Sequence, residues 1–166
     1  MRTHLSVFIA VPIEDVFAFF DDPANSMAFQ EHASEHLRGS ELIDVAPDGR
    51  RTLDVRMQSG PTKWTQTIVQ EVREVPTRQV ARSWTWTRDR NERHATISTD
   101  RRFTPVDGGT SVDVTVAFHV EHPWRHPMTA VLNRVWGQGA AKLELEHSLH
   151  NIAEHLEARH RAAAGT

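Results

Sequence analysis

Apolar and polar residues alternate with a period of two from about residue 36 to residue 120, and this pattern constrains the fold more than any other feature of the chain. Turn sequences rich in glycine, proline and aspartate interrupt the alternation at short intervals. Strands are therefore expected at about 36–45, 50–58, 63–73, 79–88, 94–104 and 110–120. Strands this close together, joined by hairpin turns, predict an antiparallel meander.

Other patterns flank the meander. Residues 3–10 alternate and predict a first strand. Pro12 suits the first position of a helix, and the two acidic residues that follow it complement the helix dipole. A second short helix is expected over about 23–30, capped by Asp22. After two further prolines, a long helix is expected from about 127 to 162.

This order of elements predicts an α+β fold, in which a seven-stranded, curved antiparallel sheet wraps around the long C-terminal helix. Two short helices follow the first strand. The length of 166 residues fits one domain. We expect that domain to span residues 1–162, with a disordered tail at 163–166.

Composition excludes several classes of function. A net charge of -3 with neutral histidines gives no electrostatic reason to expect a nucleic-acid partner. The absence of cysteine excludes disulfides, thiolate nucleophiles and cysteine metal ligands. The apolar run 5–11 is too short to span a membrane and lacks a signal-peptide cleavage pattern. We therefore expect a cytoplasmic protein, either a monomer or a homodimer.

The chain has eleven histidines, but their spacing does not predict a metal site. His119, His122 and His126 lie close together, yet the segment crosses a strand end and two prolines and matches no known ligand spacing. His147 and His150 are three residues apart on a helix, without an accompanying carboxylate motif. No bound metal is expected.

Two tryptophans and an arginine share one side of the strand that contains "RSWTWTRDR" (82–90). The alternation places Arg82, Trp84 and Trp86 together, and we predict that they face the interior. On the neighbouring strand, Trp64 and Gln66 also share a face. Aromatic walls with a few polar groups are typical of small-molecule pockets.

The same residues allow a purely structural interpretation. The indoles would then fill an ordinary core. Arg82, the sharpest catalytic candidate, would instead form an internal salt bridge with Asp100 or Glu71.

The long helix carries two apolar stripes. The first runs from Leu132 to Leu143, and the second, from Leu145 to Leu156, is rotated from it by more than 90°. Either the helix bends near Gly139, or the polar residues that continue the first stripe line one end of a cavity. Those polar residues are Glu146, His147 and His150. The small residues at 139 and 140 leave volume beside the sheet in both cases.

Two segments resemble a known superfamily. The opening "SVFIAVPIEDVFAFFDDPANSMAF" (6–29) and the closing "LELEHSLHNIAEHLEAR" (143–159) are similar to the ends of the START/SRPBCC, or helix-grip, superfamily. The polyketide cyclase/dehydrase-like branch is the nearest group. The resemblance covers nearly the whole chain, and its motifs are structural, so they specify the fold more than the function.

The resemblance implies a cavity between the sheet and the last helix. That cavity would bind a hydrophobic, aromatic or polycyclic small molecule, without a redox cofactor. The expected lining residues are Trp64, Gln66, Trp84, Trp86, Phe118, Met128, Leu132, Trp136, Gly139, Ala140 and Leu143.

The resemblance leaves the activity open. In a polyketide cyclase or dehydrase, Arg82 or a pocket histidine would stabilise an enolate or move a proton. A non-catalytic lipid or small-molecule carrier or sensor would use the same cavity. A chaperone-activator-like interaction module would instead expose an apolar patch.

Overall fold

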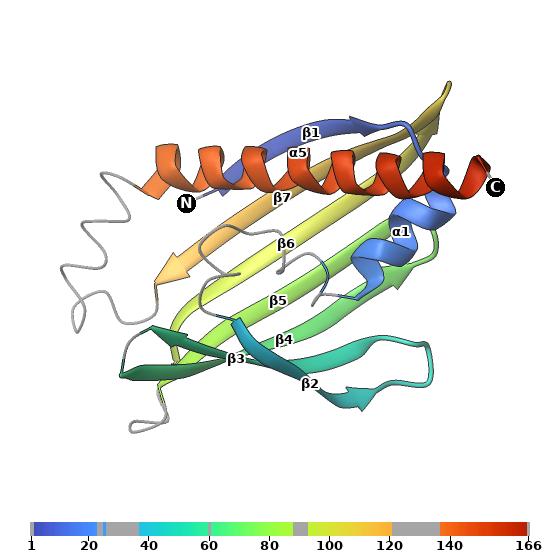
Figure 1. The fold of residues 1–166 in the computed structure, drawn as a ribbon. Coiled ribbons are helices and arrows are strands. Elements are labelled where there is room, and N and C mark those ends of the chain that lie inside the picture. The colour runs from blue at the N-terminus through green and yellow to red at the C-terminus, as the bar shows by residue number, and fades with distance from the viewer. Residues whose placement is uncertain are drawn as a thin grey trace.

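The computed structural model in Figure 1 describes residues 2–22, 25, 37–59, 61–87, 93–120 and 137–165. The elements in chain order are β1 (Arg2–Ile9), α1 (Ile13–Asp21), β2 (Leu37–Val45), β3 (Arg51–Ser59), β4 (Thr62–Glu74), β5 (Arg78–Thr87), β6 (Arg93–Val106), β7 (Gly109–Val120) and α5 (Gly137–Ala164).

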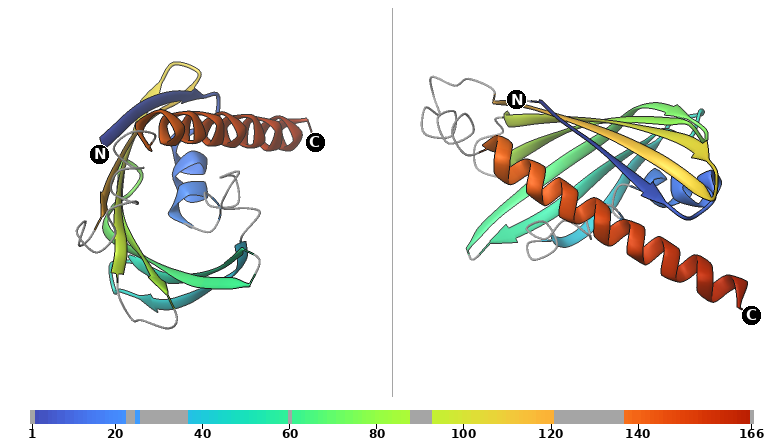
Figure 2. Two further views of the ribbon diagram at one scale, coloured as in Figure 1. Left: turned by 90° about the vertical axis from the view of Figure 1, so that its left-hand side faces the viewer. Right: turned by 90° about the horizontal axis from the view of Figure 1, so that it is seen from above.

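The seven strands form one antiparallel sheet in the order β1-β7-β6-β5-β4-β3-β2. Consecutive hairpins join β2 to β7, and β1 adds to the sheet beside β7. The sheet curls around α1, and α5 crosses the concave side obliquely next to β1 (Figure 2). The predicted fold class is confirmed, and each expected strand lies within two residues of its predicted bounds.

The predicted helices can be compared with the structure only over the described residues. The short helix expected over 23–30 falls, except for Asn25, on residues outside the described part of the chain. Of the long helix expected over 127–162, the described part is α5. This helix continues to Ala164, so the first two residues of the expected disordered tail are helical. Alanine has the highest helix propensity, which accounts for the extension.

α1 and α5 close one end of the concave side with a hydrophobic core. Phe17 of α1 packs edge-on against Phe103 of β6, with ring centroids 5.5 Å apart. Phe20 lies 5.7 Å from the same ring. α5 contributes Leu149 and Ile152, and β7 contributes buried valines. A smaller cluster of Val55, Met57, Ile68 and Ala81 lies on the inner face of β3, β4 and β5.

The second apolar stripe of α5 faces the protein, whereas Leu143, the described end of the first stripe, does not. Leu149, Ile152, Ala153 and Leu156 are buried, whereas Leu143 is 69% exposed. The polar residues that continue the first stripe, Glu146, His147 and His150, are also exposed. The prediction that Leu143 lines a cavity is therefore wrong, and so is the interpretation of those polar residues as cavity lining. Burial of the longer aliphatic stripe against α1 and β1 fixes the rotation of the helix.

The last residue of α1, Asp21, anchors this helix to the sheet. Its side chain is only 7% exposed. Arg73 of β4 donates two hydrogen bonds to the carboxylate, Nε to Oδ1 and Nη2 to Oδ2, both 2.9 Å long. These bonds raise the pKa of the Arg73 guanidinium. Gln70 donates to the Asp21 carbonyl oxygen at 3.0 Å. Cations and amide donors thus meet the negative end of the helix dipole.

Gln79 of β5 completes the anchor. With its amide oriented to satisfy both neighbours, its nitrogen donates to the carbonyl oxygen of Phe20 at 3.1 Å and its oxygen accepts from the Asp21 backbone N–H at 3.2 Å. Gln79 is almost completely buried. Strands β4 and β5 therefore hold the end of α1 through matched polar groups, and this fixes the position of Phe20.

We expect Asp21→Asn to lower the free energy of unfolding by about 2–3 kcal/mol, because the variant leaves the partly buried Arg73 cation without its carboxylate. Urea unfolding followed by circular dichroism measures the change. The matched control is Asp48→Asn, which removes the carboxylate of the exposed Arg50–Asp48 pair and should leave the unfolding midpoint nearly unchanged. Equal losses in the two variants would contradict an anchoring role for Asp21.

Candidate functional site

The face of β5 that points to the interior is not the face predicted from its tryptophans. It is the opposite one. Gln79, Ala81 and Ser83 are buried, whereas Arg82 is exposed over 51% of its side chain. The Arg82 Nε lies 3.1 Å from Oε1 of Glu71. The prediction that Arg82 faces a pocket is wrong. Of the alternatives, the pairing with Glu71 is observed, but the pair is exposed rather than internal.

Pairing with the neighbouring strand explains this choice of face. In β4, Ile68 pairs with Ser83 and Gln70 pairs with Ala81, and all four side chains are buried. A register irregularity between Gln70 and Val72 leaves Glu71 as an extra residue, and its carboxylate lies beside Arg82. Burying the aliphatic side chains of β3 and β4 thus sets the face of β5.

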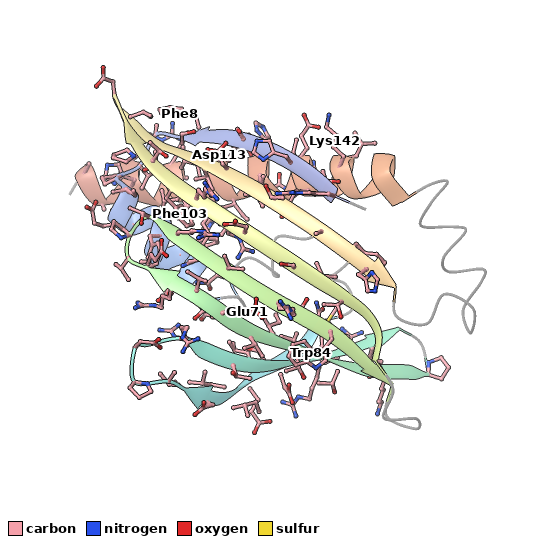
Figure 3. All side chains as sticks on the ribbon, turned by 180° about the vertical axis from the view of Figure 1, so that it is seen from behind. Phe8, Glu71, Trp84, Phe103, Asp113 and Lys142 are labelled. Atoms are coloured by element: carbon pink, nitrogen blue, oxygen red, sulfur yellow. The ribbon has the colours of Figure 1, made fainter. Side chains whose placement is uncertain are left out.

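Trp84 lies on the outer face of the sheet. It pairs with Thr67 and Thr96, and it is half-buried. Figure 3 views the sheet from the side away from the helices and shows Trp84 and Glu71 there. The prediction that Trp84 lines an internal cavity is therefore wrong.

The other predicted aromatic and helical residues are placed only in part. Trp64 pairs with Met57 and Trp86 with Thr65, but their side chains are outside the described part of the structure. Gly139 and Ala140 lie in the first turns of α5, and the Ala140 side chain is not described. Three further predicted residues fall outside the described residues altogether: Met128, Leu132 and Trp136.

Gln66 and Phe118 do lie on the inner face. Gln66 Nε2 donates to the hydroxyl of the buried Ser83 at 3.0 Å. Phe118 follows the buried Val112 and Val114 in the alternation of β7, and it pairs with Ile97. Their contact with a ligand stays a prediction.

The inner face changes from a closed core to an open wall along β6 and β7. Near α1, the paired residues Phe103 and Val112 are buried. Farther along the same face, Thr99 and its partner Val116 keep part of their surface accessible, as does Phe118. These inner-face side chains therefore keep accessible surface on the concave side. This part of the inner face mixes aliphatic, aromatic, hydroxyl and amide groups, as small-molecule sites do.

Arg101 stands at the boundary between the core and the open wall. It pairs with Gln79 of β5 and Val114 of β7, and its guanidinium carbon lies 5.3 Å from the centroid of the Phe20 ring. Burial lowers the pKa of Arg101 to about 10, yet part of its surface stays accessible. The Arg101 side chain is therefore partly desolvated where the buried core meets the partly exposed inner face. The guanidinium is still cationic at neutral pH.

The arginine beside the partly exposed inner face is therefore Arg101 of β6 rather than Arg82 of β5. The sequence "TDRRF" (99–103) indicates which of its two arginines faces inward. Arg101 is two residues before the core residue Phe103, so both share a face, whereas Arg102 points outward and is 64% exposed. The tryptophans of β5 favour Arg82 as the interior arginine, but Arg82 faces outward.

A hollow of about 420 Å³ lies at the turn between β1 and α1. Its lining includes Pro12, Pro105 and His160. The described inner-face residues do not contribute to it, so it is separate from the wall around Arg101.

The described residues form neither a metal cluster nor a membrane span. Within the described ranges, no three histidine or acidic side chains gather in a way that would hold a metal ion. His119, His147 and His150 are exposed, and His150 lies 3.2 Å from Glu154. No helix in this part of the chain is long and apolar enough to cross a membrane.

Solved structures share the architecture. TTHA0849 from Thermus thermophilus is 16% identical, with a TM-score of 0.68 over 96% of this chain and 99% of that protein. A conserved protein from Geobacillus kaustophilus is also 16% identical, with a TM-score of 0.67 over 94% and 95% of the two chains. The di-domain ARO/CYC StfQ of the steffimycin biosynthetic pathway is 12% identical, with a TM-score of 0.62. That match covers 99% of this chain and 52% of StfQ. At these identities the likeness shows the fold alone.

No curated protein sequence matches the chain. The model of one family, described as "Polyketide cyclase / dehydrase and lipid transport", matches residues 1–157. This match spans nearly the whole sequence and agrees with the helix-grip architecture of the sheet and α5. The chain therefore belongs to the polyketide cyclase/dehydrase and lipid transport family of the START/SRPBCC superfamily.

Proposed function

We propose that the chain binds a hydrophobic small molecule against the open inner wall of β4 to β7. The observation that carries this proposal is the partial exposure of Thr99, Val116 and Phe118 on a face whose neighbouring positions are fully buried. A sheet that buries one half of its inner face and leaves the other half accessible has room for a guest molecule. The family description supports the same function.

The wall offers apolar contact together with a few polar groups. Ser83 lies between Ile68 and Ile97 in the cross-strand register, and Ile97 pairs with Phe118. This row supplies aliphatic and aromatic surface with one hydroxyl. The next row, from Ala81 through Thr99 to Val116, adds a second hydroxyl. Such a surface orients a mostly apolar ligand through few hydrogen bonds.

Binding without chemical conversion is the function that the described residues support best. Acid or base catalysis needs a titratable group within hydrogen-bond reach of the ligand. The described histidines whose exposure is known lie at exposed positions, and Arg82 points away from the wall. A cyclase or dehydrase reaction is the second candidate, favoured by the family description and by the cationic Arg101, which is placed to stabilise an enolate.

Mass spectrometry after incubation with a linear polyketide separates the two candidates. A carrier returns the compound unchanged, and a cyclase or dehydrase releases a product with the mass reduced by water or with a new ring. Arg101→Met should abolish such a product while Arg102→Met preserves it.

We expect Thr99→Phe to weaken binding of the neutral dye 1-N-phenylnaphthylamine about tenfold or more, because the added ring covers part of the proposed binding surface. Dye fluorescence under excitation of the tryptophans measures the dissociation constant. The matched control is Thr104→Phe, the same change at an exposed position of the same strand, which should bind the dye as the wild type does. Unchanged affinity in a folded Thr99→Phe protein would place the ligand elsewhere.

Arg82→Met should leave the affinity for the same dye unchanged, because Arg82 lies on the outer face. Loss of the solvent-exposed pair with Glu71 should lower the free energy of unfolding by less than about 1 kcal/mol. Dye titration and urea unfolding of one protein sample measure both quantities. A substantial fall in affinity with little loss of stability would return Arg82 to the binding site.

A further inference from the structure

The pairing of the strand arginines sets Arg101 apart from its neighbours. Arg73 pairs with Asp21, Arg78 with Asp100 and Arg82 with Glu71. For Arg101, no carboxylate or hydrogen-bond acceptor lies within reach among the residues that the structure describes. Its contact there is the ring of Phe20. A partly desolvated cation without a counter-charge is costly, and this cost would be offset if a ligand supplied the missing negative charge.

The nearby carboxylates are already engaged. Arg73, Gln79 and Arg101 occupy one cross-strand row, and Asp21 lies at the end of that row. Both carboxylate oxygens of Asp21 accept hydrogen bonds from Arg73. Asp100 precedes Arg101 in sequence but lies on the opposite face, where it accepts two bonds from Arg78. The described residues therefore leave the charge of Arg101 uncompensated on the inner face of the sheet.

We propose that Arg101 is the anion-binding group of the ligand site, and that the ligand is an amphipathic acid with a carboxylate at one end and an apolar body. This proposal rests on the proposed function and names the chemical class of the ligand. The guanidinium presents five N–H donors in a planar fork that matches a carboxylate in two parallel hydrogen bonds. Phe20 supports the guanidinium carbon through a cation–π contact, which uses none of these donors.

The register of β6 places the apolar body. Inner-face positions along this strand are Arg101, Thr99 and Ile97, and the residues paired with the last two on β7 are Val116 and Phe118. Four residues of a strand span about 13 Å. An apolar body of that length, held by its carboxylate at Arg101, would lie along the partly exposed wall. Decanoate is a suitable probe because its chain is of this length.

A comparison of decanoate with decanol tests the proposal in the wild-type protein. Each compound displaces 1-N-phenylnaphthylamine, and the two differ only in the charged end. At pH 8 and low ionic strength we expect decanoate to bind about tenfold or more tightly than decanol, because a charge-assisted pair forms in a partly desolvated site. This measurement needs no variant and is unaffected by any folding defect.

Three variants assign the preference to Arg101. Arg101→Met keeps a long apolar side chain over Phe20 and should remove the preference for decanoate, while the affinity for decanol changes by less than about threefold. Arg102→Met removes the same charge from the outer face of the same strand and should retain the preference. Arg101→Lys, which keeps a point charge but loses the planar fork, should show an intermediate preference.

Each outcome is decisive. Equal binding of decanoate and decanol by the wild type overturns acid recognition and leaves the proposed function intact. A preference for decanoate that persists in a folded Arg101→Met protein also overturns it, and would assign the anion to another group. Failure of the wild type to bind the neutral dye or either ligand overturns the proposed function, and the inference with it.

Discussion

The paired hydrogen bonds between Asp21 and Arg73 determine how the rest of the structure is assembled. They hold the C-terminal end of α1 against β4, and the amide of Gln79 holds the preceding carbonyl against β5. Because the helix cannot shift along the sheet, Phe17 and Phe20 meet Phe103 in a fixed aromatic cluster. Phe20 is also the ring beneath Arg101. The ion pair of Asp21 with Arg73 on β4 therefore fixes, through Phe20, the surroundings of the Arg101 guanidinium on β6.

The same sheet serves as a core at one end and as a wall at the other. Where α1 and the apolar stripe of α5 cover it, the valines of β7 and Phe103 are closed to solvent. Beyond Arg101 the alternation continues, but the inner side chains keep accessible surface. One period-two pattern therefore yields two environments, which are closed where the described helices cover the sheet and partly exposed beyond them. The proposed site follows from this coverage rather than from any special sequence motif.

The fold was predictable because it depends on alternation and turn residues, which are local. The alternation of apolar and polar residues places each strand of the meander within two residues of its observed bounds. The two end segments indicate the superfamily. The face of β5 was not predictable in the same way. Trp84 and Arg82 suggested a pocket, but cross-strand pairing with Ile68 and Gln70 turned Ser83 and Ala81 inward. Face selection is a property of a whole sheet, and it cannot be inferred from the largest side chains of one strand. Arg101 cannot be singled out from the sequence, because its significance depends on which carboxylates are already paired with other arginines.

Arg101 also has a consequence for how the protein responds to selection. A cation desolvated beside an aromatic ring weakens the empty protein, whereas a bound acid would neutralise it. Thermal stability would therefore favour an uncharged residue at this position, whereas binding of an acid would favour arginine. Laboratory evolution for thermal tolerance alone would favour replacement of this arginine by an uncharged residue. The most thermostable variants would then be those that no longer bind the proposed acid.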